Sequence, residues 1–224
     1  FQSVLCADVS HINNDECSSP EILAQTKIIP VQSHHGKLTV SELNKHFIRR
    51  GDQHFSQAQT LSITQPTEVG TLYSLEELKE LCQWAKSKNM LIHMDGARIA
   101  NAAYRLNLPW SAFTTDLGVD VVSFGGSKNG LMFGEAILFL NPKLAQNFKF
   151  THKQFCQLPS KSRFIAAQFL AYFENDLWKS IAKNSCDQAQ SLFEKCRQIP
   201  GVEVTQPVNS NAVFVKIPRT WIKP

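Results

Sequence analysis

Short apolar runs that alternate with helical patterns limit the folds open to this chain of 224 residues. The runs are rich in valine, isoleucine, leucine and phenylalanine, and they lie at residues 3–8, 27–33, 61–65, 90–95, 121–124 and 136–140. Nearly continuous apolarity is typical of strands that are covered on both faces. Because strands and helices alternate along the chain, we expect an α/β fold with a mainly parallel sheet.

The clearest helical segment begins at Ser74. Glu77 follows three residues later, which is the pattern of a capping box. The apolar side chains that come next fall on one face of the predicted helix: Leu75, Leu78, Leu81, Cys82 and Ala85.

The pattern changes after Pro142. Residues 163–199 read as helix almost throughout, and residues 211–218 then read as a strand. We therefore expect residues 1–174 to belong to a large domain. Residues 175–224 would form a linker helix and the start of a smaller C-terminal α/β domain.

Composition and charge exclude several classes of protein. The net charge is only +4, and the basic residues are scattered, so no stripe for nucleic acid or polybasic patch for membranes is present. No apolar run approaches the ~20 residues of a membrane span. The six cysteines form no CxxC pair, which favours reduced thiols and a cytoplasmic location. No spacing of histidine and cysteine predicts a metal site.

Polar residues gather where the predicted strands end. Asp95 ends one strand, and Lys128 follows the next strand along the chain. Open α/β sheets bind ligands outside the carboxyl ends of their strands. If the sheet is parallel, Asp95 and Lys128 lie on the same ligand-binding edge.

Lys128 lies between glycines in the segment SFGGSKNG. A lysine in such a loop is most often a solvated surface residue. In a partly dry pocket, however, desolvation favours the neutral amine, which can form a Schiff base. The segment does not match the GxxxxGK[ST] phosphate loop, so that function is excluded.

Asp95 also has two compatible interpretations. It could cap a helix that begins near Ala97. Alternatively, its carboxylate could hold a pyridine nitrogen protonated, as pyridoxal phosphate requires. Arg98 lies one helical turn later and could direct its guanidinium at a phenolate or carboxylate oxygen of a ligand.

Five separated segments carry a resemblance to a known family. They are SHINNDECSSPE, TQPTEVGTLYS, HMDGAR, SFGGSKNG and GEAILF, in this order. Together they resemble the threonine aldolase and β-eliminating lyase family, in its low-specificity branch, and the later segment SKSRFIAAQF fits as well. The resemblance implies the aspartate-aminotransferase-like fold (PLP fold type I), pyridoxal 5'-phosphate as the cofactor, an amino-acid substrate, and a homodimer or homotetramer.

The resemblance also implies roles for single residues. Lys128 matches the lysine that holds the cofactor, and Asp95 matches the partner of its pyridine nitrogen. Arg98 matches the arginine near the phenolate oxygen and the substrate carboxylate. His11 matches the histidine that lies over the pyridine ring; without the resemblance it would read as a polar loop residue.

Three further residues are candidates for the site. Ser123 and Ser127 have hydroxyl groups near a glycine-rich turn and could donate to the cofactor phosphate. The family's second histidine, which assists at the substrate hydroxyl, is absent here. Glu68 lies in that neighbourhood and could take the proton-transfer role, since a carboxylate in a dry pocket can have a raised pKa. The alternative for Glu68 is a solvated turn residue.

The resemblance implies retro-aldol cleavage of β-hydroxy-α-amino acids, with threonine or allo-threonine giving glycine and acetaldehyde. Another β-eliminating lyase and a phenylserine-type aldolase are the alternatives within the family. The family's phosphate-binding segment would lie before Phe1 and its small-domain arginine after Pro224. We therefore expect this chain to be a piece of a longer protein and a poor catalyst alone; a non-catalytic fragment is a further alternative.

Overall fold

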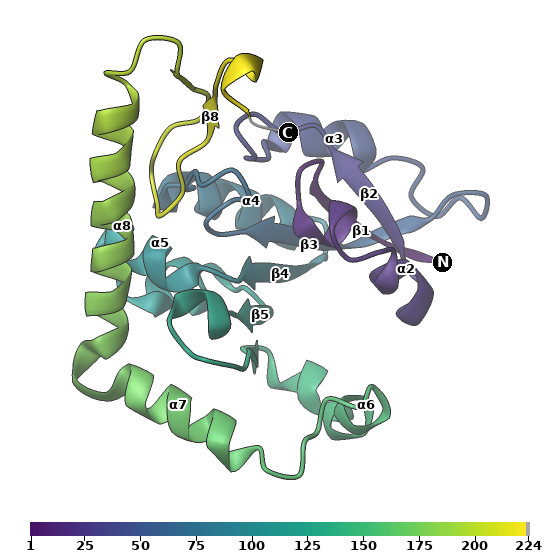
Figure 1. Ribbon diagram of the computed structural model, residues 1–224. Coiled ribbons are helices and arrows are strands. Elements are labelled where there is room, and N and C mark those ends of the chain that lie inside the picture. Colours follow the sequence, from purple (N-terminus) through teal and green to yellow (C-terminus); the bar gives the residue numbers. More distant parts are fainter. Residues whose placement is uncertain (223–224) are drawn as a thin grey trace.

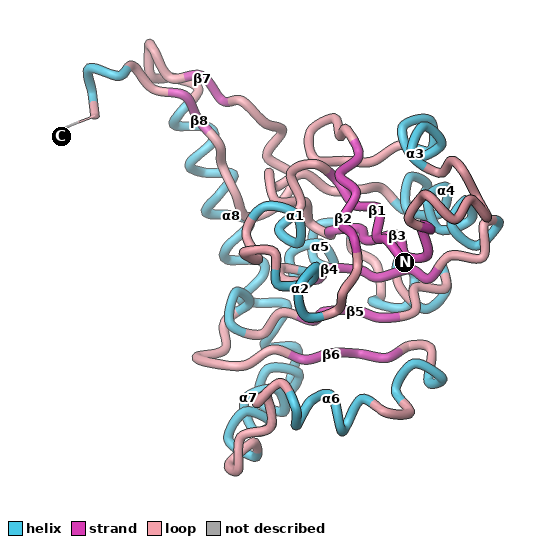
Figure 2. Tube along the Cα trace, turned by 90° about the vertical axis from the view of Figure 1, so that its right-hand side faces the viewer, coloured by secondary structure: helices cyan, strands magenta, loops and turns pink. Residues whose placement is uncertain are grey.

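The computed structural model describes residues 1–222 and is built around one six-stranded sheet (Figure 1). The strand order is β2-β1-β3-β4-β5-β6, and Figure 2 shows β6 at the edge of the sheet. Strands β1 to β5 are parallel, and β6 is antiparallel to β5. The strands span Gln2–Ala7 (β1), Lys27–Val31 (β2), Gln57–Thr64 (β3), Leu91–Gly96 (β4), Val121–Phe124 (β5) and Ala136–Phe139 (β6).

The structure therefore confirms the α/β class, the mainly parallel sheet and all six strands of the sheet. The largest difference is in β3, which begins at Gln57, whereas the apolar run begins at residue 61. Gln57 pairs in register with Gln2 of β1. The hydrogen-bonded ladder thus extends beyond the part of β3 that is apolar, which a pattern of side chains does not reveal.

Eight α-helices cover and flank the sheet in the described part of the chain. They span His11–Asn14 (α1), Ser19–Leu23 (α2), Val40–His46 (α3), Leu75–Ser87 (α4), Ile99–Leu106 (α5), Phe148–Gln154 (α6), Arg163–Phe173 (α7) and Leu177–Cys196 (α8). Helices α4 and α5 contact β4, and α8 contacts α5. None of these helices is long and apolar enough to cross a membrane.

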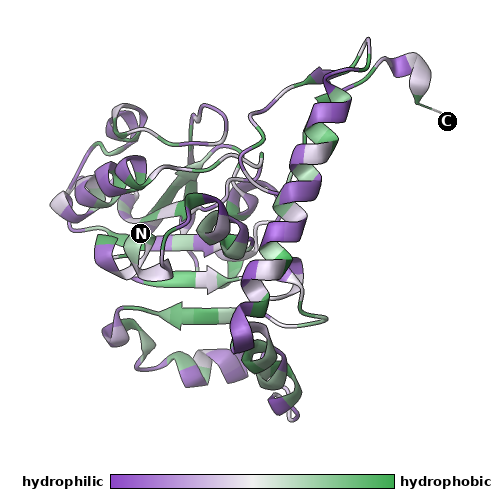
Figure 3. Cartoon of the chain, turned by 90° about the vertical axis from the view of Figure 1, so that its left-hand side faces the viewer, coloured by the Kyte–Doolittle hydropathy of each residue, from purple (hydrophilic) through white to green (hydrophobic). Residues whose placement is uncertain are grey.

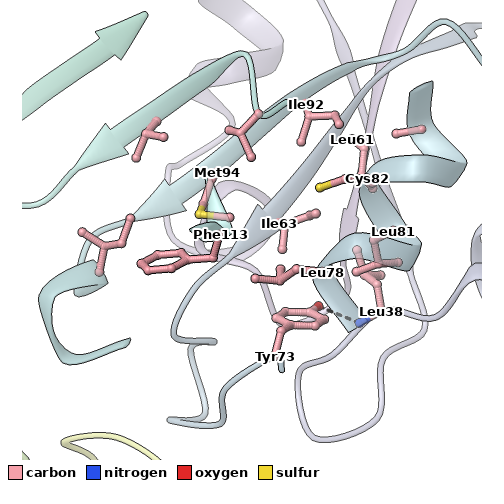
Figure 4. Packing of buried hydrophobic residues seen from close by; sticks show 14 of the residues in the cluster. Leu38, Leu61, Ile63, Tyr73, Leu78, Leu81, Cys82, Ile92, Met94 and Phe113 are labelled. Atoms are coloured by element: carbon pink, nitrogen blue, oxygen red, sulfur yellow. Dashed lines mark hydrogen bonds between the residues drawn. The ribbon is translucent and has the colours of Figure 1, made fainter. Parts of the chain in front are cut away.

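Helix α4 confirms the predicted capping box. The Ser74 side chain accepts from the Glu77 N–H, and the Glu77 carboxylate accepts from the Ser74 N–H. The apolar face of α4 then packs against the sheet (Figure 4). At the edge of this core the Leu38 N–H donates to the Tyr73 hydroxyl over 2.7 Å, so the one polar atom of that buried ring is satisfied.

The prediction of nearly continuous helix over residues 163–199 is wrong at one place. Asn175 and Asp176 have positive φ angles of 51° and 56°, so α7 ends and α8 leaves in a new direction (Figure 1). Helix α8 is held on α5 by Asn101, whose side chain is 2% exposed and accepts from the Ser185 hydroxyl over 2.7 Å. Hydrophilic residues lie along the length of α8 in Figure 3.

The predicted strand over residues 211–218 is much shorter in the structure. Only Val215–Lys216 (β8) is strand, and it pairs antiparallel with Glu203–Val204 (β7). The partner strand is itself two residues long, which limits the ladder. The division of the chain at residues 174 and 175 stays a prediction.

Candidate active site

A cavity of about 580 Å³ lies at the carboxyl ends of β3, β4 and β5 and beside α1. Its size falls within the range of roughly 300–1,000 Å³ that is usual for small-molecule sites. Strand order reverses between β1 and β3, which is where open α/β sheets bind ligands. Six of the seven predicted site residues line this one cavity: His11, Glu68, Asp95, Arg98, Ser123 and Lys128. Ser127 does not; it lines a second cavity, of about 770 Å³, among β6, α6 and α7.

Lys128 lies in a single turn of 3-10 helix, Ser127–Asn129, directly after β5. Gly125 allows the chain to approach the turn after β4, because a Cβ atom there would lie 2.1 Å from the Ala97 carbonyl oxygen. The Asn129 amide donates to the carbonyls of Ala97 (3.1 Å) and Gly125 (2.6 Å). The Lys128 turn is therefore fastened to the turn that follows Asp95.

Glu135 fastens the other side of the Lys128 turn. Its carboxylate accepts from the N–H of Gly126 over 2.7 Å and from the N–H of Ser127 over 3.2 Å. Sequence reasoning missed this residue, which comes from the antiparallel edge of the sheet. An external phosphate could reach these two amides only by displacing Glu135. The Ser127 hydroxyl as a phosphate donor stays a prediction.

Replacing Glu135 with alanine is expected to speed amide hydrogen exchange at Gly126 and Ser127 by about tenfold. A hydrogen bond to a charged group contributes ~1.5–3 kcal/mol, and the exposure of Glu135 places its effect at the lower end. Exchange measured by mass spectrometry or NMR tests this, with Glu80→Ala on the exposed side of α4 as the control. Unchanged exchange at Gly126 would show that the carboxylate does not protect the turn.

Asp95 does not cap the helix that was expected to begin near Ala97. Helix α5 begins at Ile99, and Arg98 occupies its N-cap position. Asp95 instead accepts through Oδ1 from the Ala97 N–H over 2.9 Å, which closes the turn between β4 and α5. Within residues 1–222 the structure gives Oδ2 no hydrogen-bond partner, so one carboxylate oxygen is left for a ligand.

Glu68 is half-buried, and the two oxygens of its carboxylate differ. Oε1 accepts from the His11 N–H and from the Thr64 hydroxyl, each over 2.9 Å. Oε2 is buried and has no partner among the described residues. Burial raises the pKa of Glu68, and the charge of Asp95 adds to the rise. The reading of Glu68 as a solvated turn residue is therefore wrong.

His11 opens α1 at the rim of the cavity, where it is partly exposed. Its Nδ1 pairs with Oε1 of Glu16 over 2.6 Å. The backbone N–H of His11 holds Glu68, as described above, so the ends of β1 and β3 are linked across the cavity. Arg98 is half-buried and lies on the wall formed by the β4–α5 turn.

His93 is a second cavity residue that sequence reasoning missed. It lies two residues before Asp95, on the same face of β4. Its Nδ1 pairs with Ser62 Oγ and its Nε2 with Ser123 Oγ, each over 2.9 Å. Burial lowers the pKa of His93 below its ordinary value, which favours the neutral ring. The alternation of side chains along a strand would have been enough to place His93 beside Asp95.

Comparison with known proteins gives a consistent result. A model of the beta-eliminating lyase family matches residues 1–218. A low specificity L-threonine aldolase of Pseudomonas sp. (strain NCIMB 10558) is 39% identical over 218 residues, which make up 97% of this chain and 63% of that protein. This chain therefore spans a little less than two thirds of that curated relative.

Solved structures agree in fold. A threonine aldolase of Leishmania major superposes with a TM-score of 0.86 at 25% identity, over 96% of this chain and 62% of that one. An Escherichia coli protein with a described methionine aminotransferase function superposes with a TM-score of 0.73 over 96% of this chain and 55% of that one. At 12% identity the second match shows the fold alone.

Proposed function

This chain belongs to the beta-eliminating lyase family and has the PLP fold type I architecture, and on that premise we propose that the whole protein is a pyridoxal-phosphate-dependent lyase. Its reaction would be retro-aldol cleavage of β-hydroxy-α-amino acids, with threonine or allo-threonine giving glycine and acetaldehyde. The name of the 39% identical Pseudomonas relative supports this substrate class. The observation that carries the proposal is one cavity that brings together an amine (Lys128), a carboxylate with a free oxygen (Asp95) and a buried carboxyl group (Glu68).

The residues around the cavity fit pyridoxal phosphate in their chemistry. Lys128 would hold the aldehyde carbon, and Asp95 would use its free Oδ2 to keep the ring nitrogen protonated. Arg98 would face the phenolate oxygen and the substrate carboxylate, and His11 would lie over the ring. When bound, the cofactor supplies an electron sink for the pair released at the substrate α-carbon.

Glu68 is the proposed proton acceptor. Thr64 and the His11 N–H occupy Oε1, whereas the buried Oε2 has no hydrogen-bond partner among the described residues. The raised pKa makes this carboxylate a stronger base than an exposed one. The Glu68 carboxylate would accept the proton of the substrate β-hydroxyl as the aldehyde leaves, and it would return the proton in the reverse direction.

Replacing Glu68 with glutamine is expected to lower turnover by about 10²–10⁴-fold, the usual contribution of a general base. The same change should alter how stability depends on pH. The pKa of Glu68 is higher in the folded protein than in the unfolded chain. The contribution of Glu68 to stability is therefore fully present below its unfolded pKa, and it is lost as pH rises through its folded pKa. Glutamine does not titrate. The free energy of unfolding of the variant, relative to that of the wild type, should therefore increase as pH rises.

Urea unfolding at a series of pH values, together with steady-state kinetics, measures both effects. Glu80→Gln on the exposed side of α4 is the matched control. Wild-type turnover in Glu68→Gln would remove Glu68 from the mechanism, whatever its effect on stability.

The reaction itself is tested by product analysis with the whole protein. Glycine and acetaldehyde from threonine, dependent on added pyridoxal phosphate, are the expected products. Glycine and benzaldehyde from phenylserine alone would shift the assignment to a phenylserine-type aldolase. Pyruvate and sulfide from cysteine, with no cleavage of threonine, would overturn the aldolase proposal in favour of β-elimination. If added pyridoxal phosphate gave the protein no yellow absorbance that borohydride bleaches, the protein would not be a pyridoxal enzyme.

We further infer a homodimer or homotetramer. Apolar side chains are exposed in the loop between the Lys128 turn and β6 and on α7: Met132 is 95% exposed, Leu170 75% and Phe133 64%. The backbone amides of Met132 and Phe133 donate to the Gln168 side chain, so this loop is held against α7. A contiguous apolar surface of this kind is typical of subunit contacts. Light scattering should give a dimer or larger for the whole protein, and a monodisperse monomer would contradict this.

A cytoplasmic location stays a prediction.

A further inference from the structure

Three polar side chains form a continuous row beneath the cavity, across three strands. Ser62 lies on β3, His93 on β4 and Ser123 on β5. Both ring nitrogens of His93 are engaged, Nδ1 with Ser62 and Nε2 with Ser123, at the 2.9 Å distances given above. Ser123 pairs in register with Asp95, and both line the cavity. The row therefore ends next to the carboxylate that is proposed to hold the cofactor.

Burial determines the direction of these hydrogen bonds. Ser62 is 4% exposed, and within residues 1–222 its hydroxyl has only His93 as a partner. A buried hydroxyl proton without an acceptor is costly, so Ser62 must donate to Nδ1. A neutral imidazole that accepts at Nδ1 carries its proton on Nε2. Nε2 then donates to Ser123 Oγ.

The opposite arrangements leave a buried proton unpaired. If Nδ1 carried the proton, it would donate to Ser62, and the Ser62 proton would have no acceptor among the described residues. A doubly protonated ring has the same defect, and burial disfavours its charge more than the nearby Asp95 carboxylate favours it, so the pKa of His93 is lowered. One arrangement satisfies every buried atom of the row.

We propose that His93 is a positioning residue that fixes the Ser123 hydroxyl as a hydrogen-bond donor into the cavity. Because Ser123 Oγ already accepts from His93, its own proton is directed to an acceptor on the cavity side. The ligand chemistry that suits this donor is an anionic oxygen beside Asp95, carried either by the cofactor or by the amino-acid substrate. The proton arrangement is a property of the folded chain, whereas its effect on ligand binding rests on the proposed function.

The arrangement of protons can be measured without the cofactor. In the whole, cofactor-free protein, 15N NMR of the histidine rings should show His93 as a neutral ring protonated on Nε2, with His93→Gln identifying its signals. Ser62→Ala should allow the two neutral tautomers to mix, because Nδ1 loses its donor. Ser123→Ala should leave the Nε2 proton in place. A wild-type ring protonated on Nδ1, or on both nitrogens near neutral pH, would overturn the proposal.

A second measurement follows the Ser123 donor to its acceptor. Ser123→Ala and His93→Phe should each raise either the dissociation constant of pyridoxal phosphate or the KM for the amino acid by about tenfold. This is the loss expected for a hydrogen bond to a charged oxygen. A change in the dissociation constant of pyridoxal phosphate would identify a cofactor oxygen, and a change in KM for the amino acid would identify a substrate oxygen. The double variant should lose no more than either single variant, because both act through one hydroxyl.

His93→Gln is the matched control, since its amide offers one donor and one acceptor as the neutral ring does. It should retain most of the binding that His93→Phe loses. Independent, additive losses in the double variant would overturn the proposal, and so would wild-type values for both constants in Ser123→Ala. If the protein failed to cleave threonine, the NMR result and the cofactor dissociation constant would still decide the role of His93.

Discussion

Replacing Lys128 with alanine is expected to abolish covalent capture of pyridoxal phosphate and to lower turnover by about 10³-fold or more, the order of loss seen when a nucleophile or base is removed. The Lys128 side chain is exposed to the cavity, and within residues 1–222 the structure gives its amine no hydrogen-bond partner. Its loss should therefore leave the fold intact. Gly125, Asn129 and Glu135 would still hold the turn, because their contacts are to backbone atoms.

Borohydride reduction followed by peptide mass mapping measures the attachment site in the Lys128→Ala variant. Lys79→Ala, on the exposed side of α4, is the control and should still be labelled at Lys128. Attachment of the cofactor to one other lysine in Lys128→Ala would show that the assignment is wrong. Circular dichroism of both variants would establish that the comparison is between folded proteins.

Asp95→Asn is expected to retain some cofactor and to lower turnover by about 10–10³-fold. A carboxylate next to a cationic nitrogen shifts the pKa of that nitrogen by ~1–3 units, and an amide does not. The substitution is close to isosteric. The asparagine oxygen can still accept from the Ala97 N–H, so the turn between β4 and α5 should persist.

Steady-state kinetics and the cofactor absorbance spectrum measure the two effects of Asp95→Asn separately. Asp116→Asn, in an exposed turn, is the control for the chemistry of the substitution. Turnover equal to that of the wild type would reduce Asp95 to a residue that closes a turn. A large loss of thermal stability in Asp95→Asn would instead point to a structural role for the charge.

The sequence predicted the sheet and most of the cavity, for a physical reason. Strands covered on both faces are mostly apolar, so they stand out, and the polar residues at their ends then converge by topology. This is why Asp95 and Lys128 could be placed together. Ser127 could not be separated from Lys128 in this way, because the direction of each side chain depends on the local turn, and the structure directs Ser127 to the other cavity.

Other features depend on contacts between distant parts of the chain. Glu135 meets the Lys128 turn only because β6 returns antiparallel to β5. The break between α7 and α8 falls on Asn175 and Asp176, with no glycine or proline to mark it. The length of β8 was overestimated because an apolar run does not indicate how long its partner strand is. Patterns along the sequence indicate which residues are buried, but they do not indicate which distant segments pair with one another.

The hydrogen bonds that fasten the Lys128 turn have a consequence for the thermodynamics of ligand binding. A flexible loop that becomes ordered on binding loses conformational entropy at that moment, and its affinity falls accordingly. Glu135 and Asn129 already fix this turn in the chain by itself. The entropy of these backbone torsions is therefore lost when the protein folds, and ordering this turn adds no further cost when a ligand binds.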